Sequence, residues 1–315
     1  MKYTQIGKTD LIVSRICFGC WQLSPRFWGN ISIEQWNIAL ERAMELGINF
    51  IDTADVYGDG MAETVLGEFL QSHKCRQKLI IATKFYWNFQ DPDNRYPDTG
   101  YDYIIQECEA SLKRLKTDYI DLYQIHSWDP LARPEEIAAA LLTLKKQGKI
   151  RHIGVSNTNV HQMSMYLKHM DIECLQPLYN ILDREIENEE LPFCLEKKIG
   201  VITYSSLARG LLTGKYSKDQ KFEDSRASHP RFTGENFKKI LNAVDTFMKP
   251  VAESLGLTVA GLAIRWILAH PAISSAIVGI KKPEHIETVV NAADDVLERK
   301  LWHKLANEMK NACGT

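Results

Sequence analysis

Several features that mark other classes of protein are missing from this sequence of 315 residues. No apolar run reaches the roughly 18 residues of a membrane span, because Arg265 interrupts even the apolar stretch 262–269. The net charge is only −2, which gives no electrostatic reason to expect nucleic acid or an anionic membrane as a partner. The N-terminus also lacks the hydrophobic region of a signal peptide. These absences predict a cytoplasmic protein.

Two further absences concern cysteine and glycine. The seven cysteines are odd in number and widely scattered, which suits free thiols in a reducing compartment better than a disulfide framework. No expected strand is followed by the Gly-x-Gly-x-x-Gly turn of an open dinucleotide-binding sheet. The 45% of hydrophobic residues nevertheless suffice for a large core.

Short β-branched runs alternate with longer amphipathic segments about eight times along the chain. We expect strands at 15–18, 49–52, 79–83, 120–125, 152–155, 174–177, 201–204 and 275–278. We expect helices near 33–46, 62–72, 101–116, 134–147, 159–169, 185–198, 236–255, 258–270 and 283–295. Gly47, Gly148 and Gly200 are expected to end the helices that precede them.

Strands that are apolar on both faces and separated by helices predict a parallel sheet covered on both sides. Eight such units favour a closed (β/α)8 barrel, the TIM barrel of the α/β class, over an open sheet, with residues 1–315 as a single domain. Residues 3–6 and 11–13 predict an N-terminal β-hairpin that plugs one end of the barrel. The segment 205–235, after the seventh strand, is too long for an ordinary connection and predicts a functional loop.

Reactive side chains gather where the expected strands end. Asp52, Lys84, His126, Asn157, Gln176 and Tyr204 all lie at or just past strand ends, where the active sites of such barrels are found. Tyr57 follows Asp52 by five positions. A tyrosine has an ordinary pKa of about 10, and we expect the Lys84 ammonium, held by Asp52, to lower the pKa of Tyr57. The set predicts a proton-transfer site.

The chain resembles the aldo-keto reductases, and among them the bacterial and potassium-channel-β-like branch. Asp52, Tyr57, Lys84 and His126 match the family's catalytic four in order and spacing. Five further phrases also match: Phe18-Gly19, the segment 47–54, Gly154-Val155-Ser156-Asn157, the segment 176–180 and the segment 210–215. The resemblance implies an enzyme that reduces an aldehyde or ketone to an alcohol by hydride transfer from a nicotinamide cofactor. Tyr57 would be the general acid, and His126 would orient the carbonyl.

The resemblance also assigns cofactor-binding residues. Those implied for the nicotinamide end are Ser156, Asn157, Gln176 and Tyr204, and those for the pyrophosphate are Ser205, Leu207, Gly210 and Lys215. Those for the adenosine end are Gly279, Lys281 and His285. The chain departs from the family at Thr288-Val289, where many relatives carry a Glu-Asn pair against the adenine.

The segment 279–285 predicts which nicotinamide cofactor is used. Lys281 and His285 stand at the start of an expected helix, where the helix dipole also favours an anion. No acidic residue of this segment is obviously placed to take a ribose 2′-hydroxyl. We therefore expect NADPH, with its 2′-phosphate, to be preferred to NADH.

Four tryptophans in the expected strand-end loops are candidates for the wall of a substrate pocket: Trp21, Trp28, Trp87 and Trp128. They suit a small-molecule carbonyl compound as the substrate. Two other functions remain open. One is a Schiff-base lyase with Lys84 as the nucleophile, and the other is a cofactor-binding sensor or regulatory subunit with slow turnover. No metal site is expected, and the oligomeric state does not follow from the sequence.

Overall fold

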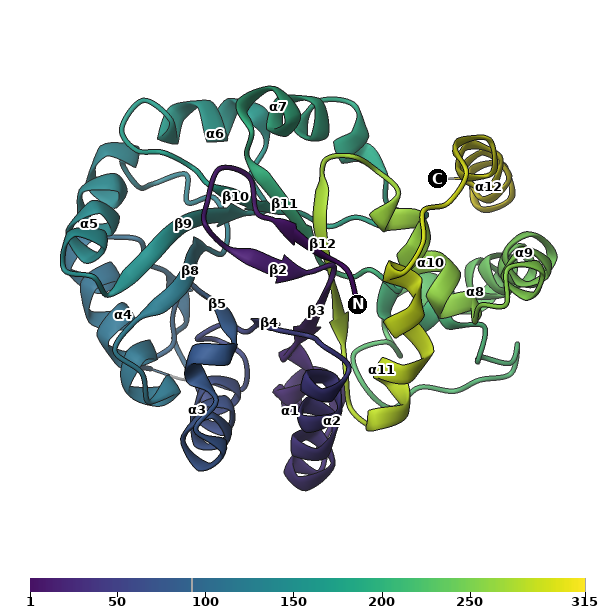
Figure 1. Cartoon of the computed structure of the whole chain (residues 1–315), viewed down its shortest axis with the longest axis horizontal. Coiled ribbons are helices and arrows are strands. Elements are labelled where there is room, and N and C mark those ends of the chain that lie inside the picture. Colours follow the sequence, from purple (N-terminus) through teal and green to yellow (C-terminus); the bar gives the residue numbers. More distant parts are fainter. Residues whose placement is uncertain (92, 315) are drawn as a thin grey trace.

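Eight parallel strands form a closed barrel at the centre of the computed structural model, which describes residues 1–91 and 93–314 (Figure 1). The strands are β3 (Ile16–Gly19), β4 (Phe50–Asp52), β5 (Ile80–Phe85), β8 (Ile120–Ile125), β9 (Ile150–Ser156), β10 (Cys174–Gln176), β11 (Gly200–Thr203) and β12 (Ile273–Gly279). They follow one another around the barrel in chain order, and β12 pairs with β3 to close it. The predicted (β/α)8 barrel is confirmed.

Helices surround the barrel (Figure 1). They are α1 (Pro25–Trp28), α2 (Ile33–Glu45), α3 (Met61–His73), α4 (Tyr101–Leu115), α5 (Pro134–Lys146), α6 (Val160–Tyr166), α7 (Glu190–Lys197), α8 (Gly234–Ala243), α9 (Lys249–Ser254), α10 (Val259–Leu268), α11 (Pro283–Val290) and α12 (Arg299–Cys313). Local signals set several starts: the Ser32 hydroxyl accepts a hydrogen bond from the Gln35 backbone N–H, and Pro134 opens α5.

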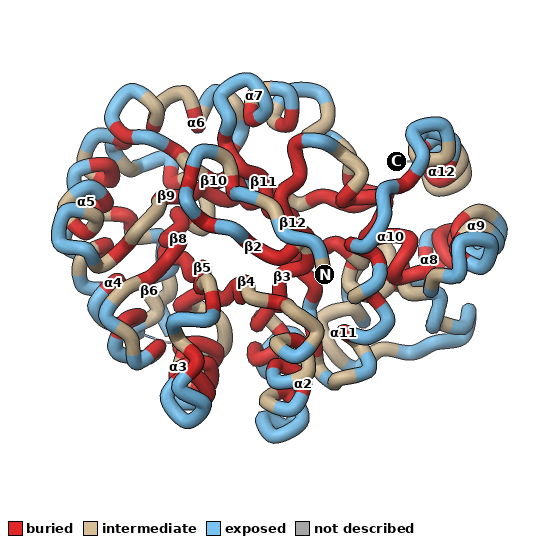
Figure 2. The backbone as a smooth tube through the Cα atoms, viewed as in Figure 1, coloured by how far each residue is buried: buried red, intermediate tan, exposed pale blue. Residues whose placement is uncertain are grey.

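The core has two parts, one inside the barrel and one between the barrel and its helices. Figure 2 shows buried residues along the strands and on the inward faces of the helices, with exposed residues on the outside. The helix α10 has all ten of its residues buried. No single helix in the described part of the chain is long and apolar enough to cross a membrane, although the bent pair formed by 234–254 and 259–268 meets that test on length and composition.

The N-terminal hairpin closes one end of the barrel. Strand β1 (Tyr3–Gln5) pairs antiparallel with β2 (Ile12–Ser14), and Ile6, Leu11 and Val13 pack into the barrel interior. Gly200 was expected to end helix α7, but Lys198 takes the left-handed conformation there, with φ of 56°. Gly200 instead begins β11, where a Cβ would lie 2.4 Å from Ile6 Cγ2. Its lack of a side chain therefore makes room for the hairpin.

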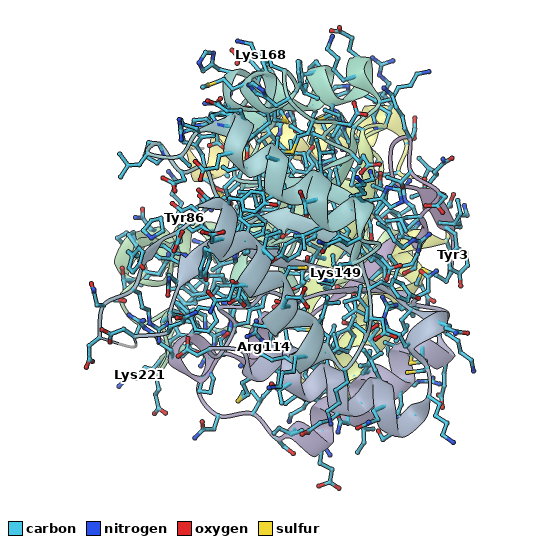
Figure 3. All side chains as sticks on the ribbon, turned by 90° about the vertical axis from the view of Figure 1, so that its left-hand side faces the viewer. Tyr3, Tyr86, Arg114, Lys149, Lys168 and Lys221 are labelled. Atoms are coloured by element: carbon cyan, nitrogen blue, oxygen red, sulfur yellow. The ribbon has the colours of Figure 1, made fainter. Side chains whose placement is uncertain are left out.

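The opposite end of the barrel carries the irregular segments. Figure 3, turned by 90°, places Tyr3 of the hairpin on one side of the molecule and Tyr86 and Lys221 toward the other. The segment 205–235 contains two short 3-10 helices, Ala208–Thr213 and Pro230–Phe232, and runs into the start of α8 at Gly234. A small hairpin, β6 (Trp87–Asn88) with β7 (Tyr96–Pro97), follows β5 and was not predicted.

Helix α12 was also not predicted. It packs against α8, and its residues Leu305, Ala306 and Met309 are buried. Its Trp302 ring stacks on that of Trp266 in α10, with the centroids 4.7 Å apart, and each indole N–H donates to the backbone carbonyl of the other tryptophan. This reciprocal pair fixes α12 to the rest of the fold.

Candidate active site

A buried ion pair joins the ends of β4 and β5. The Lys84 ammonium donates to both carboxylate oxygens of Asp52, at 2.7 and 2.9 Å, and to the backbone oxygen of Thr53, at 2.7 Å. Lys84 is completely buried and Asp52 is 3% exposed. The three contacts use the three N–H donors of an ammonium group. The neighbouring Asp52 carboxylate raises the pKa of Lys84 above its ordinary value despite the opposing effect of burial, so this amine stays protonated.

The Tyr57 ring lies beside this pair, 5.2 Å from the Lys84 ammonium nitrogen. Burial raises the pKa of Tyr57 to about 12, and the Lys84 charge opposes that effect only in part. Our expectation that Lys84 lowers this pKa below its ordinary value is therefore wrong, because loss of hydration disfavours the phenolate more than the ammonium favours it. The phenol is thus protonated at neutral pH.

His126 faces Tyr57 from the end of β8. Their ring centroids are 5.8 Å apart and the rings meet edge to face. Burial, together with the positive charge of Lys84, lowers the pKa of His126 to about 3. The imidazole is therefore neutral at physiological pH. Its Nδ1 has no hydrogen-bond partner among the described residues.

The residues expected to hold a nicotinamide ring form one hydrogen-bonded chain at the ends of β9, β10 and β11, joined by Asn157 Nδ2, which donates to Ser156 Oγ at 3.2 Å. The Tyr204 hydroxyl donates to Asn157 Oδ1 at 2.7 Å, and Asn157 Nδ2 donates to the His126 backbone oxygen at 3.0 Å. Ser156 Oγ donates to the backbone oxygen of Gln176 at 2.7 Å, and Gln176 Nε2 donates to Asp52 Oδ2 at 2.7 Å. The chain thus connects the expected cofactor residues to the Asp52–Lys84 pair.

Two cavities meet at Tyr57. The first has a volume of about 820 Å³ and is lined by Tyr57, His126, Ser156, Asn157, Gln176 and Tyr204 as well as by residues of the surrounding loops. The second has a volume of about 380 Å³ and runs between the 205–216 segment and the end of β12. Tyr57, Trp21, Tyr204 and Arg209 line both. A molecule in either cavity therefore reaches the Tyr57 side chain.

The second cavity brings together the remaining cofactor-binding candidates. They are Ser205, Leu207, Gly210, Lys215, Gly279, Lys281 and His285. Thr288 also lines this cavity, with its hydroxyl bonded to the His285 backbone oxygen at 2.8 Å, whereas Val289 is completely buried. Arg226 lines the cavity too and was not predicted, since no local pattern distinguishes it from other loop arginines.

The residues of the second cavity fit a phosphate-bearing cofactor. Lys215 and Lys281 form no ion pair with a carboxylate of the described residues, and burial, reinforced by the Arg226 charge, lowers the pKa of each. Lys281 Nζ lies 4.9 Å from the Trp28 ring centroid. Gln22 Oε1 is buried in the same region without a hydrogen-bond partner in the described part of the chain. Excess positive charge and a spare acceptor suit the phosphates and the polar groups of a nicotinamide dinucleotide.

The four tryptophans lie in different surroundings. Trp21 and Trp87 line the first cavity, and Trp21 also lines the second. Trp28 lines only the second, where its ring lies edge-on to Trp21 at a centroid distance of 5.2 Å. Trp128 is not among the described residues that line either cavity and packs against Tyr166 at 5.3 Å. A role for Trp128 in a substrate pocket therefore gains no support from this geometry.

Comparisons with known proteins agree with this geometry. Residues 15–307 match the sequence model of the aldo/keto reductase family. The chain is 38% identical over 291 residues to the aldo-keto reductase YhdN of Bacillus subtilis, covering 92% of this chain and 88% of that protein. It is 34% identical over 326 residues to the NADH-specific methylglyoxal reductase of Escherichia coli, covering 97% and 99%.

The chain is also 33% identical over 310 residues to a probable voltage-gated potassium channel β subunit of Arabidopsis thaliana. The alignment covers 93% of this chain and 92% of that protein. The solved structure of the glycerol dehydrogenase AKR11B4 of Gluconobacter oxydans superposes with a TM-score of 0.90 at 33% identity, covering 99% of this chain and 96% of that one. The chain therefore belongs to the aldo/keto reductase family, oxidoreductases that reduce carbonyl groups with a nicotinamide cofactor.

Proposed function

We propose that this protein is an NADPH-dependent reductase that converts an aldehyde or ketone to an alcohol with Tyr57 as the general acid. One observation carries the proposal: the side chain of Tyr57 lines both cavities and lies between the Asp52–Lys84 pair and a neutral His126. A carbonyl compound in the first cavity and a cofactor in the second would meet at this phenol.

The chain's own residues supply the proton and hold the substrate. With a pKa of about 12, Tyr57 is protonated at pH 7 and is able to donate to a carbonyl oxygen as negative charge develops there. The Lys84 ammonium, 5.2 Å from the ring centroid, stabilises the resulting phenolate. Neutral His126 is able to donate one hydrogen bond to the same oxygen. Reduced nicotinamide, when bound, supplies the hydride.

The state of Lys84 favours this function over a Schiff-base lyase. A Schiff base needs an unprotonated amine with a free lone pair. The Asp52 carboxylate holds the pKa of Lys84 above its ordinary value, and the three ammonium N–H groups already have acceptors. An attack by Lys84 on a carbonyl would have to break this buried ion pair.

The preference for NADPH rests on the charge of the second cavity. Lys215, Arg226 and Lys281 line it. The Asp224 carboxylate attracts the Lys281 ammonium, but Asp224 is already bonded to Arg226 at 2.5 Å. A 2′-phosphate would relieve the mutual repulsion of these cations, whereas the 2′-hydroxyl of NADH would not. One relative is named as NADH-specific, and parallel titrations of NADPH and NADH test the preference in this protein.

Substitution of Tyr57 by phenylalanine tests the proposal. The variant should still bind NADPH, measured by quenching of tryptophan fluorescence, but lose about 10²–10⁴-fold in kcat for an aldehyde, because the general acid is gone. Tyr101→Phe is a matched control, since the Tyr101 hydroxyl bonds Thr143 on the outer helices and its residue lines neither cavity. Near-native kcat in Tyr57→Phe, on a substrate whose chemical step limits the rate, would exclude the assigned role.

A further inference from the structure

The first cavity is rich in positive charge around the proposed site of carbonyl reduction. Of the described residues, three arginines line it, Arg26, Arg95 and Arg209, and one aspartate, Asp59. The Asp59 carboxylate is fully engaged, because its two oxygens accept from the two terminal nitrogens of Arg95 at 2.8 and 2.6 Å. Arg26 and Arg209 thus have no free carboxylate among the described residues that line this cavity.

Arg209 is the more deeply placed of these two arginines. Its residue is half-buried and lines both cavities, whereas Arg26 is exposed. No side-chain hydrogen bond or ion pair of Arg209 occurs within the described ranges 1–91 and 93–314. Asp224 attracts it only at a distance, since both Asp224 oxygens are bonded to Arg226. Burial accordingly lowers the pKa of Arg209 from its ordinary value.

The guanidinium of Arg209 is held in place by an aromatic ring. Its central carbon lies 5.3 Å from the ring centroid of Trp21, a residue that also lines both cavities. A guanidinium that stacks on a ring keeps its N–H donors free at the edge, in the fork that binds a carboxylate or a phosphate. Arg209 therefore has a fixed position and unused donors beside Tyr57.

The backbone at Arg209 is costly for a residue with a side chain. Arg209 has φ of 55°, Ala208 before it has 47° and Gly210 after it has 103°. Glycine occupies this left-handed region at no steric cost, whereas an arginine is strained there. Strain of this kind is concentrated at functional sites. The backbone conformation therefore does not itself favour arginine here, and the contacts of the side chain have to account for it.

We propose that Arg209 binds an anionic group on the carbonyl substrate, so that the preferred substrates are aldehydes or ketones that carry a carboxylate or a phosphate. This rests on the proposed reductase function, and it adds the class of substrate. The cofactor's phosphates have separate cations in Lys215, Arg226 and Lys281, none of which lines the first cavity. The Arg209 guanidinium, with the neutral Trp21 ring beside it, also lines the cavity proposed for the substrate.

Matched substrates provide the test. We would compare 4-carboxybenzaldehyde with its neutral methyl ester, methyl 4-formylbenzoate, and glyceraldehyde 3-phosphate with glyceraldehyde. One charge-assisted contact at a partly exposed site predicts about a tenfold higher kcat/KM for the charged member, reduced by high salt. A preference in the first pair alone identifies a carboxylate, and in the second alone a phosphate. Equal kcat/KM values within both pairs would overturn the proposal.

Variants of single arginines show which residue causes the preference for the charged substrate. Arg209→Gln should remove it by lowering kcat/KM for the charged substrate about tenfold, while the neutral partner and the Kd for NADPH stay unchanged. Arg133→Gln, the same change of charge at a side chain that is 75% exposed and outside both cavities, should retain the preference. If Arg209→Gln weakens NADPH binding and slows both substrates equally, Arg209 serves the cofactor and the proposal fails. Loss of the preference in Arg26→Gln and not in Arg209→Gln would also refute it.

A binding measurement that involves no reaction tests the anion site independently of the proposed reductase function. The alcohol 4-(hydroxymethyl)benzoate and its methyl ester would be titrated calorimetrically into the protein saturated with NADPH, which cannot oxidise an alcohol, so no turnover accompanies binding. Tighter binding of the carboxylate, lost in Arg209→Gln, would support the anion site even if no aldehyde were reduced. Equal binding of acid and ester would exclude the site even if reduction were observed.

Discussion

Lys84 and Asp52 form a buried ion pair in which the ammonium donates to both carboxylate oxygens, at 2.7 and 2.9 Å. Gln176 Nε2 donates to the same carboxylate at 2.7 Å. Removal of one partner from such a pair leaves an uncompensated buried charge, which costs more than the pair itself contributes. Loss of either residue of the pair that supports the proposed proton donor should thus also lower the stability of the fold.

We therefore expect stability and activity to respond differently to changes in this pair. Asp52→Asn and Lys84→Met should each lower the free energy of unfolding by about 3–5 kcal/mol, because each leaves one charge alone. The double variant should recover part of that stability but none of the carbonyl reduction, since both residues act through Tyr57. Urea unfolding and kcat/KM are the measurements. Additive losses of stability in the double variant would contradict a coupled pair.

Cofactor preference is expected to depend on Lys281. Its Nζ donates to the Trp28 backbone oxygen at 3.3 Å and so is already directed into the second cavity. Lys281→Ala should weaken NADPH about tenfold and leave NADH nearly unchanged, because only NADPH carries the 2′-phosphate. Fluorescence titrations of both cofactors at low and high salt would check this. Equal weakening of the two cofactors, or tighter NADH than NADPH in the parent protein, would contradict it.

His285 contributes to the preference for NADPH as a neutral side chain. Burial and the neighbouring Lys215 charge lower the pKa of His285 below its ordinary value of 6.5. Its Nδ1 accepts from the Lys281 backbone N–H at 3.3 Å. At pH 7 the ring is then neutral and offers a hydrogen bond through Nε2, not a charge. The NADPH preference should consequently stay flat from pH 7 upward until the lysines titrate.

The positions of most elements follow from local patterns in the sequence. These patterns are the alternating apolar runs, the Ser32 cap and Pro134, and each involves only residues close together in the chain. The eight strands and most helices could therefore be predicted from the sequence to within a few residues. The four catalytic candidates were found because strand ends gather at one face of a barrel. Helix α12 was missed although Leu305 and Met309 have helical spacing, because its partner α8 is distant in the sequence.

Properties set by burial or by loop shape could not be read from the sequence. The pKa of Tyr57 depends on how far the phenol is removed from water, which outweighs the visible neighbouring charge of Lys84. The sequence likewise does not reveal that the Arg209 side chain has no hydrogen-bond partner among the described residues, since that depends on which arginines bond Asp59 and Asp224. Gly200 looked like a helix terminus and proved to be a point of close contact with the hairpin.

The last prediction concerns stability at the other end of the barrel, where His152 joins the hairpin to the strands. His152 Nε2 lies 2.7 Å from Asp10 and Nδ1 lies 2.7 Å from Glu173, and Lys145 also bonds Glu173. Burial alone would lower the pKa of His152, but the two carboxylates raise it above 6.5. Those of Asp10 and Glu173 are lowered from 3.8 and 4.5 by their bonds to His152 and to nearby cations.

A histidine whose pKa is raised by folding stabilises the protein fully below its unfolded pKa, and this stabilisation disappears as the pH rises through the folded value. The two carboxylates stabilise above their unfolded pKa values and lose this effect as the pH falls through their lowered values. The cluster should thus stabilise the fold most between pH 4.5 and 6.5.

In that pH range, His152→Gln should lower the free energy of unfolding by about 1 kcal/mol, a modest figure because Asp10 is 69% exposed. At pH 9 the loss should be smaller. Urea unfolding across pH 5–9 would measure this, with exposed His161→Gln as the control. A cost of His152→Gln that stays constant with pH would rule out the charged cluster as its cause.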